Sequence, residues 1–244
     1  MLRLWIVCAV LLSLPVEAHQ PRPRIAVVID DLGYQLDSGR YLAALPYAIT
    51  LSVIPDTPFA QAIAREARAR QKELMLHIPM EPLHVKHWEE GLTTEMDQPA
   101  LSEELKRMLG DFPDAQGINN HGGSKLTADI TRMQWVMNIL AQESLFFLDS
   151  RTTGDTVADL AAHHLDVAFA ERDVFLDNIK TPAHIAQQFQ TLRRVARTKG
   201  SALAIGHPYP ETLASLGDEL PRLVQEGFDI VFCSELAEIW LMPN

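Results

Sequence analysis

The sequence is poor in cysteine and in basic residues, and each shortage excludes a class of protein. Only two cysteines, Cys8 and Cys233, occur in 244 residues, so neither a disulfide framework nor a zinc site built on cysteine pairs is expected. Lys and Arg total 21 against 32 Asp and Glu, which gives a net charge of −11. Because such an acidic surface repels phosphate backbones at long range, we expect no nucleic acid partner.

Long hydrophobic runs are also scarce. An apolar run from Leu4 to Val16 follows the basic Arg3, and it is shorter than the about 20 residues of a membrane-spanning helix. Residues 16–18 fit a small-residue cleavage site. We therefore expect a signal peptide at 1–18, a short leader at 19–23 and one domain at 24–244, with no transmembrane segment after signal removal. The protein is expected to be exported, periplasmic or secreted; an uncleaved signal acting as a tether is the alternative.

From Arg24 onwards, apolar and β-branched runs alternate with segments of helical period. This βα alternation is typical of a parallel sheet, and near-continuous apolar strands indicate burial on both faces. The sequence therefore predicts an α/β protein. The predicted strands are 24–30, 48–54, 73–78, 116–119, 145–149, 166–169, 202–205 and 229–232.

Two threonine-proline pairs mark helix starts between these strands. Thr57-Pro58 and Thr181-Pro182 each place a capping hydroxyl before a proline at the first helical position. In residues 181–199, apolar side chains recur at three- and four-residue steps and form one stripe. We expect the opposite face, which carries Arg193 and Arg197, to be exposed to solvent without a binding role.

Polar residues suited to catalysis follow five of the predicted strands. These strand ends are Asp30-Asp31, His77, Asn119-Asn120-His121, Asp149-Ser150-Arg151 and His207. The carboxyl ends of parallel strands meet on one face, so we expect these side chains to share one rim. Each strand end alone has a structural explanation, as a turn, cap, ion pair or loop residue. Their coincidence favours a functional site.

The residue types at this rim match the chemistry of a metal hydrolase. A carboxylate with two neutral imidazoles is a ligand set for a divalent metal of the zinc class, with positions left for water and substrate. Such a metal acidifies water and polarises an acyl oxygen, while a second carboxylate can accept a proton and a histidine can donate one. Asp30 and Asp31 are consecutive, so they face opposite sides unless the strand end turns.

Five motifs, taken in order, resemble those of the divergent polysaccharide deacetylases. They are residues 25–33 (IAVVIDDLG), 76–82 (LHIPMEP), 117–124 (GINNHGGS), 147–152 (FLDSRT) and 204–208 (AIGHP). The likeness extends from Arg24 to Trp240. It implies an irregular (β/α) barrel of about seven parallel strands, related to deacetylases that remove N- or O-acetyl groups from chitin-like or peptidoglycan sugars.

The resemblance implies catalytic roles for several of these residues. The first aspartate of the pair, Asp30, would be the general base, and the second, Asp31, a metal ligand. His207 follows an apolar pair on the last strand of the motif set and would be the general acid. We expect Asp149, together with Arg151, to orient His207 or the base.

The metal ligands depart from the family's usual pattern. Its better-known members take both metal histidines from one His-x-x-x-His motif, whereas here Glu81 stands four residues after His77. The second imidazole would therefore come from His121 on the next strand, and zinc is the expected metal. The expected substrate-binding residues are Glu81, Asn120, Ser124, Arg151 and Tyr209.

Together these features predict an exported, metal-dependent hydrolase that removes acetyl groups from an acetylated oligo- or polysaccharide. The altered histidine pattern favours a second hypothesis, a catalytically inactive saccharide-binding or envelope-regulatory barrel that retains the metal site. A third hypothesis is a metal-dependent amidase or esterase acting on other acyl groups, because nothing in the motifs specifies a sugar.

Overall fold

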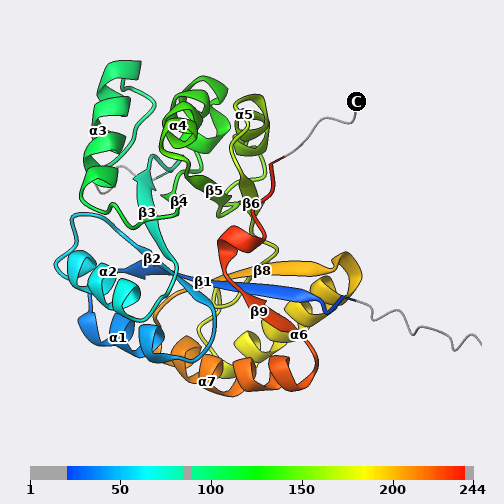
Figure 1. Cartoon of the computed structure of the whole chain (residues 1–244). Coiled ribbons are helices and arrows are strands. Elements are labelled where there is room, and N and C mark those ends of the chain that lie inside the picture. The colour runs from blue at the N-terminus through cyan, green and yellow to red at the C-terminus, as the bar shows by residue number, and fades with distance from the viewer. Residues whose placement is uncertain (1–20, 85–89, 240–244) are drawn as a thin grey trace, which may run out of the picture.

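The computed structural model describes residues 21–84 and 90–239. In these residues nine strands form one sheet in the order β6-β5-β4-β3-β2-β1-β8-β7, and β9 pairs with β1. Every pairing is parallel, and the sheet curls into an incomplete (β/α) barrel, as predicted (Figure 1). The strands are β1 (Arg24–Leu32), β2 (Ile49–Val53), β3 (Leu74–Met80), β4 (Gly117–Gly122), β5 (Phe146–Asp149), β6 (Phe169–Glu171), β7 (Val174–Phe175), β8 (Ser201–Gly206) and β9 (Asp229–Val231).

The two edges of the sheet differ from the prediction. The strand predicted at 166–169 is displaced, because β6 begins only at Phe169. Strand β7 was not predicted, since two residues are too few to show any periodicity. Only Arg172 and Asp173 separate β6 from β7, although these strands end the sheet on opposite sides. So short a connection holds both edges close together, and this nearly closes the barrel.

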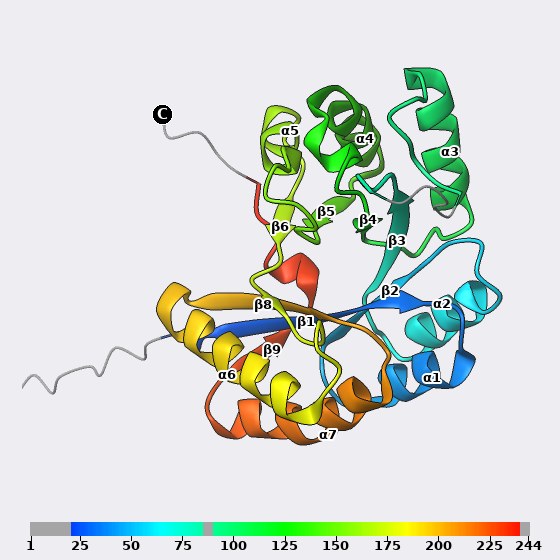
Figure 2. The same cartoon turned by 180° about the vertical axis from the view of Figure 1, so that it is seen from behind.

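The helices cover the outer face of the curled sheet. Helices α1, α2, α6 and α7 lie against β1, β2, β8 and β9, and helices α3, α4 and α5 lie beside β3 to β6 (Figure 1 and Figure 2). None of the helices in the described residues is long and apolar enough to cross a membrane. The helices are α1 (Leu36–Ala44), α2 (Ala60–Ala69), α3 (Gln98–Gly110), α4 (Ile130–Glu143), α5 (Ala158–His164), α6 (Pro182–Lys199) and α7 (Pro210–Gln225).

One of the two predicted helix starts is confirmed. Helix α6 is capped by Thr181, whose side chain accepts a backbone N–H bond from the first turn. The other prediction is wrong, because Thr57 lies in a turn and donates its hydroxyl to the carbonyl oxygen of Ile54 at 2.6 Å. Helix α2 therefore begins at Ala60, two residues after the predicted first helical residue Pro58.

The prediction that Arg193 faces solvent is also wrong, since Arg193 is only 2% exposed. Arg193 follows Phe189 by four residues and precedes Ala196 by three, so it lies on the buried stripe of α6. Its Nη2 lies 2.7 Å from Glu219 on α7, and its Nε lies 3.0 Å from Glu226 at the end of α7. This buried cation joins the two helices.

Side-chain alternation along the strands separates two cores. In β1, Ile25, Val27 and Ile29 pack with the helices, whereas Ala26 and Val28 belong to a smaller cluster of strand residues inside the barrel. The inner cluster also takes residues from β3, β5, β6, β8 and β9. The barrel interior is therefore filled by side chains and is not a pore.

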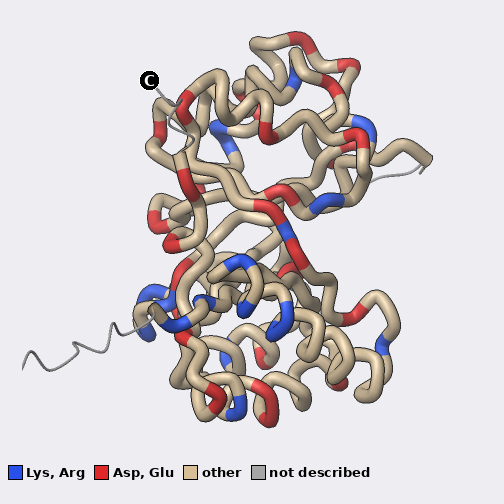
Figure 3. The backbone as a smooth tube through the Cα atoms, turned by 90° about the vertical axis from the view of Figure 1, so that its right-hand side faces the viewer, with Lys and Arg blue, Asp and Glu red and all other residues tan. Residues whose placement is uncertain are grey.

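Charged residues of both signs are interspersed along the described chain (Figure 3). Several form ion pairs, such as Arg107 with Asp56 at 2.7 Å and Lys199 with Asp173 at 2.7 Å. The predicted signal peptide at 1–18, the start of the leader at 19–20 and the chain end at 240–244 lie outside the described residues.

Candidate functional site

The polar residues at the strand ends continue the inner face of the barrel. Three of them each stand two residues after an apolar residue of the inner cluster. They are Asp30 on β1, His77 on β3 and His207 directly after β8. Successive side chains of a strand alternate between faces, so these three point inward at the carboxyl end. His121 lies at the end of β4 beside them. The barrel interior thus changes from apolar to polar at its mouth.

A bulge in β1 brings Asp31 to the same mouth as Asp30. Near the strand end, three residues of β1 stand against two of β2. Asp31 has a φ of 54°, in the left-handed region that aspartate enters more readily than most residues. This turn at the strand end lets two consecutive carboxylates approach the same cluster.

Asp31, His77 and His121 bring three donor atoms together. The Nε2 atom of His77 lies 3.4 Å from Asp31 Oδ1 and 3.0 Å from His121 Nδ1. The third side of the triangle, His121 Nδ1 to Asp31 Oδ1, measures 3.1 Å. Donor atoms bound to one tetrahedral zinc ion lie about 3.3 Å apart. The triangle therefore has the size of a metal site.

The surroundings of Asp31 support the same conclusion. Among the described residues, its buried Oδ1 atom is approached by the imidazole nitrogens of His77 and His121, at 3.4 and 3.1 Å. When these imidazoles are neutral they supply no positive charge, and a cation between the three atoms would compensate the charge of the buried carboxylate. The residues present thus fit a divalent cation.

Asn119, which was placed at the rim but not predicted to have a role, holds both Asp30 and His77. Its Nδ2 donates to the two carboxylate oxygens of Asp30 at 2.9 and 3.0 Å. Its Oδ1 accepts from Ser52 Oγ at 2.7 Å and lies 2.9 Å from His77 Nδ1. Because Oδ1 is an acceptor, neutral His77 carries its proton on Nδ1 and turns the lone pair of Nε2 toward Asp31.

Asp31, His77 and His121 are called the triad below, and the charges in the barrel mouth shift the pKa values of two of them. Burial alone would lower the pKa of His77, but the carboxylates of Asp30 and Asp31 outweigh burial and raise it. Burial would raise the pKa of Asp31, yet His121 and His77 hold that pKa well below its usual range. Without a cation the cluster therefore favours an extra proton, and metal binding would displace this proton.

Asp177, another residue that was not predicted, orients His207. Its Oδ1 lies 2.9 Å from His207 Nδ1, and its Oδ2 accepts from the backbone N–H of His207 at 2.6 Å. This arrangement turns His207 Nε2 toward the cluster, where it lies 3.8 Å from Asp31 Oδ2. Burial lowers the pKa of His207, but Asp177, Asp30 and Asp31 together raise it above its usual value.

Asp149 has its contacts within the loop after β5, and Arg151 contacts that loop and strand β6. The carboxylate of Asp149 accepts from the backbone N–H of Arg151 at 2.7 Å and from Thr156 Oγ1 at 2.8 Å. The guanidinium of Arg151 lies 3.5 Å from Glu171. The contacts with His207 or Asp30 that were expected of Asp149 and Arg151 are made in the structure by Asp177 and Asn119.

The remaining predicted substrate-binding residues divide into two groups. Glu81, Asn120 and Ser124 each accept a backbone N–H bond from a neighbouring loop, at 2.7, 2.9 and 2.9 Å, and so tie loops together. Tyr209 instead lies beside the catalytic candidate His207, with ring centroids 5.5 Å apart. Tyr209 is thus the predicted substrate-binding residue whose side chain lies beside the barrel mouth.

These features define a class: a parallel (β/α) barrel with an Asp-His-His cluster at the carboxyl ends of its strands. Residues 27–237 match the family model described as "Divergent polysaccharide deacetylase". The chain belongs to this family, which confirms the resemblance found in its motifs.

Two curated relatives extend over most of the chain. A protein of Haemophilus influenzae is 38% identical over 204 residues, covering 83% of this chain and 73% of its own length. The protein YibQ of Escherichia coli is 40% identical over 206 residues, covering 84% of this chain and 63% of its own length. Both are described as uncharacterized, so neither supplies an activity.

Solved structures share the fold. The protein Atu2773 of Agrobacterium tumefaciens superposes with a TM-score of 0.85 at 24% identity, over 90% of this chain and 91% of that chain. A family 4 carbohydrate esterase of Streptomyces lividans, solved in complex with acetate, gives a TM-score of 0.54 at 14% identity, over 91% and 98% of the two chains. These likenesses establish the barrel of carbohydrate deacetylases and do not themselves fix a substrate.

Proposed function

We propose that this protein is an exported, metal-dependent hydrolase that removes acetyl groups from an envelope or extracellular saccharide. One observation carries the proposal: the triangle of donor atoms formed by Asp31, His77 and His121, with sides of 3.0 to 3.4 Å. Family membership supports the deacetylase class, and the position of the triangle at the barrel mouth agrees with it.

The triad would hold the cation through one carboxylate oxygen and two imidazole nitrogens. Zinc suits this mixed oxygen and nitrogen set, and three protein ligands leave room for water and substrate. When bound, the cation would polarise the acetyl carbonyl and acidify a water molecule. Asn119 supports the site by fixing the tautomer of His77.

Asp30 is placed to act as the general base. It is 2% exposed, and its Oδ2 lies 3.6 Å from His77 Nε2, beside the triad. The two bonds from Asn119 Nδ2 aim the carboxylate and leave acceptor capacity toward the mouth. As the water oxygen attacks the acetyl carbon, Asp30 takes the proton that the water loses.

His207 is placed to act as the general acid. Asp177 holds its Nδ1–H, so the second proton of the imidazolium, on Nε2, is the one that can be donated into the mouth. When the bond between the acetyl carbon and the sugar nitrogen or oxygen breaks, Nε2 protonates the leaving atom. Acetate and the free sugar amine or hydroxyl are the products, and the proton on Asp30 returns to His207 through solvent.

Metal content and acetate release test the proposal together. Purified wild-type protein should contain about one zinc per chain and release acetate from tri-N-acetylchitotriose or peptidoglycan, and a chelator should stop the release. His121→Ala should lose both the metal and the activity, whereas Asp30→Asn should keep the metal and lose the activity. His164→Ala, a change of an exposed histidine at the end of α5, on the side where β6 begins, should alter neither.

Each contrary result points to a different conclusion. Full metal retention in His121→Ala would remove this residue from the ligand set. Saccharide binding by metal-loaded protein without acetate release would favour the inactive binding module. Turnover of a small acetyl ester without release from any saccharide would instead support the amidase or esterase hypothesis.

A further inference from the structure

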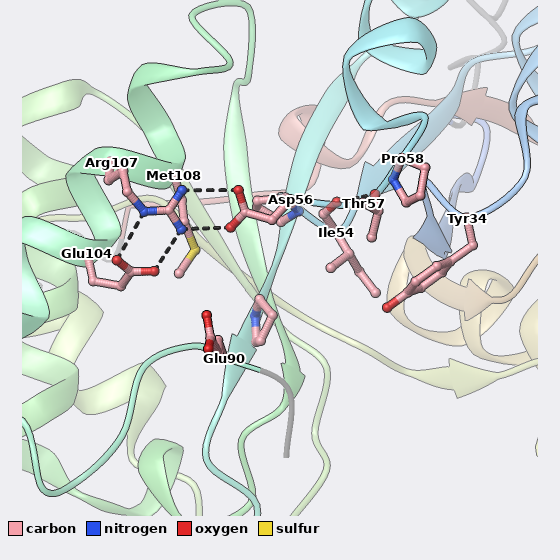
Figure 4. A pocket seen from close by; sticks show the side chains of 11 residues that line it. Tyr34, Ile54, Asp56, Thr57, Pro58, Glu90, Glu104, Arg107 and Met108 are labelled. Atoms are coloured by element: carbon pink, nitrogen blue, oxygen red, sulfur yellow. Dashed lines mark hydrogen bonds and ion pairs between the residues drawn. The ribbon is translucent and has the colours of Figure 1, made fainter. Parts of the chain in front are cut away.

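A cavity of about 500 Å³ opens at the carboxyl ends of β1, β2 and β3, the ends of the strands that also carry the candidate metal site. This volume lies within the range of roughly 300–1,000 Å³ that is usual for small-molecule sites. Its walls come from the loops after β1 and β2, from the end of β3 and from α3 (Figure 4). The residues that matter here are Tyr34, Asp56, Thr57, Pro79, Glu104 and Arg107.

The chain connects this cavity directly to the triad. Tyr34 follows the candidate ligand Asp31 by three residues, and Pro79 follows His77 by two. Pro79 is also the register partner of His121 in the pairing of β3 with β4. One wall of the cavity therefore lies a single strand spacing from the candidate ligand His121, within reach of the next unit of a molecule bound at the triad.

The walls are held in place before any ligand binds. The carbonyl oxygen of Gly33 accepts the backbone N–H of Phe59 at 2.8 Å, which joins the loops after β1 and β2. A Cβ atom at Gly33 would lie 1.8 Å from Thr57 Oγ1, so this close approach requires glycine. The loops thus form a fixed wall, and little ordering cost is expected on binding.

Arg107 fixes the polar side of the cavity. Its guanidinium bonds Asp56 at 3.1 and 2.7 Å and Glu104 at 3.1 and 2.8 Å (Figure 4). These contacts use four of its five N–H groups, and among the described residues they leave one for a ligand. Each carboxylate oxygen can still accept a second bond. The cavity therefore presents one donor and several acceptors in fixed positions.

The remaining surface suits the face of a sugar ring. Tyr34 is 49% exposed, and its ring turns toward the cavity (Figure 4). An aromatic ring beside fixed hydrogen-bonding groups is the combination that packs on ring C–H groups while it binds hydroxyls. The carboxylates of Asp56, Glu90 and Glu104 outnumber the single guanidinium, which disfavours an acidic sugar.

We propose that this cavity is the subsite for the sugar adjacent to the acetylated one, and that it selects sugars without an acidic group. The proposal rests on the proposed deacetylase function, because the triad defines where the acetylated sugar lies. Tyr34 packs on the ring of the adjacent sugar, and the network of Arg107, Asp56 and Glu104 binds its hydroxyls.

Binding of cellotriose tests the subsite apart from catalysis, because cellotriose carries no acetyl group. Calorimetric titration of the wild-type protein should give a measurable Kd, and Tyr34→Ala should raise it about tenfold, the effect of one lost aromatic contact. Tyr41→Ala is the matched control: Tyr41 is 41% exposed on α1, does not line the cavity, and its loss should leave the Kd unchanged.

A second binding experiment tests the selection against acidic sugars. Trigalacturonate should bind at least tenfold more weakly than cellotriose, and Glu104→Gln should narrow that ratio even if Tyr34→Ala fails to fold. The subsite proposal is overturned if cellotriose does not bind at millimolar concentration, if Tyr34→Ala behaves as Tyr41→Ala, or if trigalacturonate binds as well as cellotriose. Acetate release would judge the deacetylase proposal separately, since cellotriose can bind whether or not the protein turns over.

Discussion

Replacing Asp177 by Asn separates the orientation of His207 from its protonation. The carboxylate of Asp177 is fully buried and accepts three bonds: from His207 Nδ1, from the His207 backbone N–H and from Thr212 Oγ1 at 2.7 Å. Asn has nearly the same shape, but it carries no charge, and its amide group cannot accept from all three donors. The imidazole should therefore remain near its position while its protonated form loses stabilisation.

The size of the effect follows from the lost charge-assisted bond. Such a bond is worth about 1.5–3 kcal/mol, and 1.36 kcal/mol corresponds to about one pKa unit. Asp177 raises the pKa of His207 in the wild type, so Asp177→Asn should lower that pKa by about one to two units. The general acid works only when protonated. Activity is lost as pH rises through this pKa, and the alkaline limb of the pH profile should move about one to two pH units toward lower pH.

The assay is kcat for acetate release between pH 5 and 10 with the metal saturating, for wild type and variant. Asp30, Asp31 and the metal affect both proteins equally, so the difference between the limbs reports Asp177 alone. Thr212→Val is the matched control, because it removes one bond to Asp177 and leaves the contact between Asp177 and His207. An alkaline limb that stays in place in Asp177→Asn, or moves equally in Thr212→Val, would refute the assignment of His207 as the acid positioned by Asp177.

Two further predictions concern stability. Zinc at a thousand times its Kd should add about 4 kcal/mol to the free energy of unfolding and raise Tm by about 10 °C in a thermal scan. His121→Ala should remove this rise, and an equal rise in both proteins would place the ion elsewhere. Arg193→Met should lower the free energy of unfolding, measured in urea, by about 3 kcal/mol, because it removes the buried partner of Glu219. Arg197→Met, at a side chain that is 56% exposed, should lower it by less than about 1 kcal/mol. Equal costs for the two arginines would contradict the buried pairing.

The strand ends could be predicted because parallel strands bring their carboxyl ends to one face whatever the loops between them do. The resemblance to the deacetylase family singled out Asp31 as the ligand, but that rule was sufficient to expect the Asp30-Asp31 pair on one rim with His77 and His121, although about ninety residues separate the first from the last. It does not say which polar groups serve as supports. Asn119 faces inward two residues before His121, and nothing in its residue type distinguishes a support from a turn residue.

There are physical reasons why the sequence did not reveal the roles of Asp177 and Arg193. Asp177 follows a strand of two residues, too short for any alternation, although Val174-Phe175-Leu176-Asp177 repeats the pattern of an apolar run closed by an acid. Arg193 lay on the apolar stripe by its spacing from Phe189, and its charge was taken as a sign of exposure. A buried cation escapes such an inference because its partner, Glu219, belongs to another helix that only the tertiary fold brings near.

Curvature of the sheet explains how this chain builds a metal triangle without a His-x-x-x-His motif. Strands β3 and β4 are neighbours, so His77 and His121 meet across one strand pair. Asp31 lies on β1, which β2 separates from β3, and in a flat sheet that is a distance of about 10 Å. Yet Asp31 Oδ1 lies 3.4 Å from His77 Nε2, because side chains on the concave face of a curled sheet converge and the bulge turns Asp31 inward. The altered motif thus changes which strands deliver the imidazoles, while the distances between the donor atoms still suit one cation.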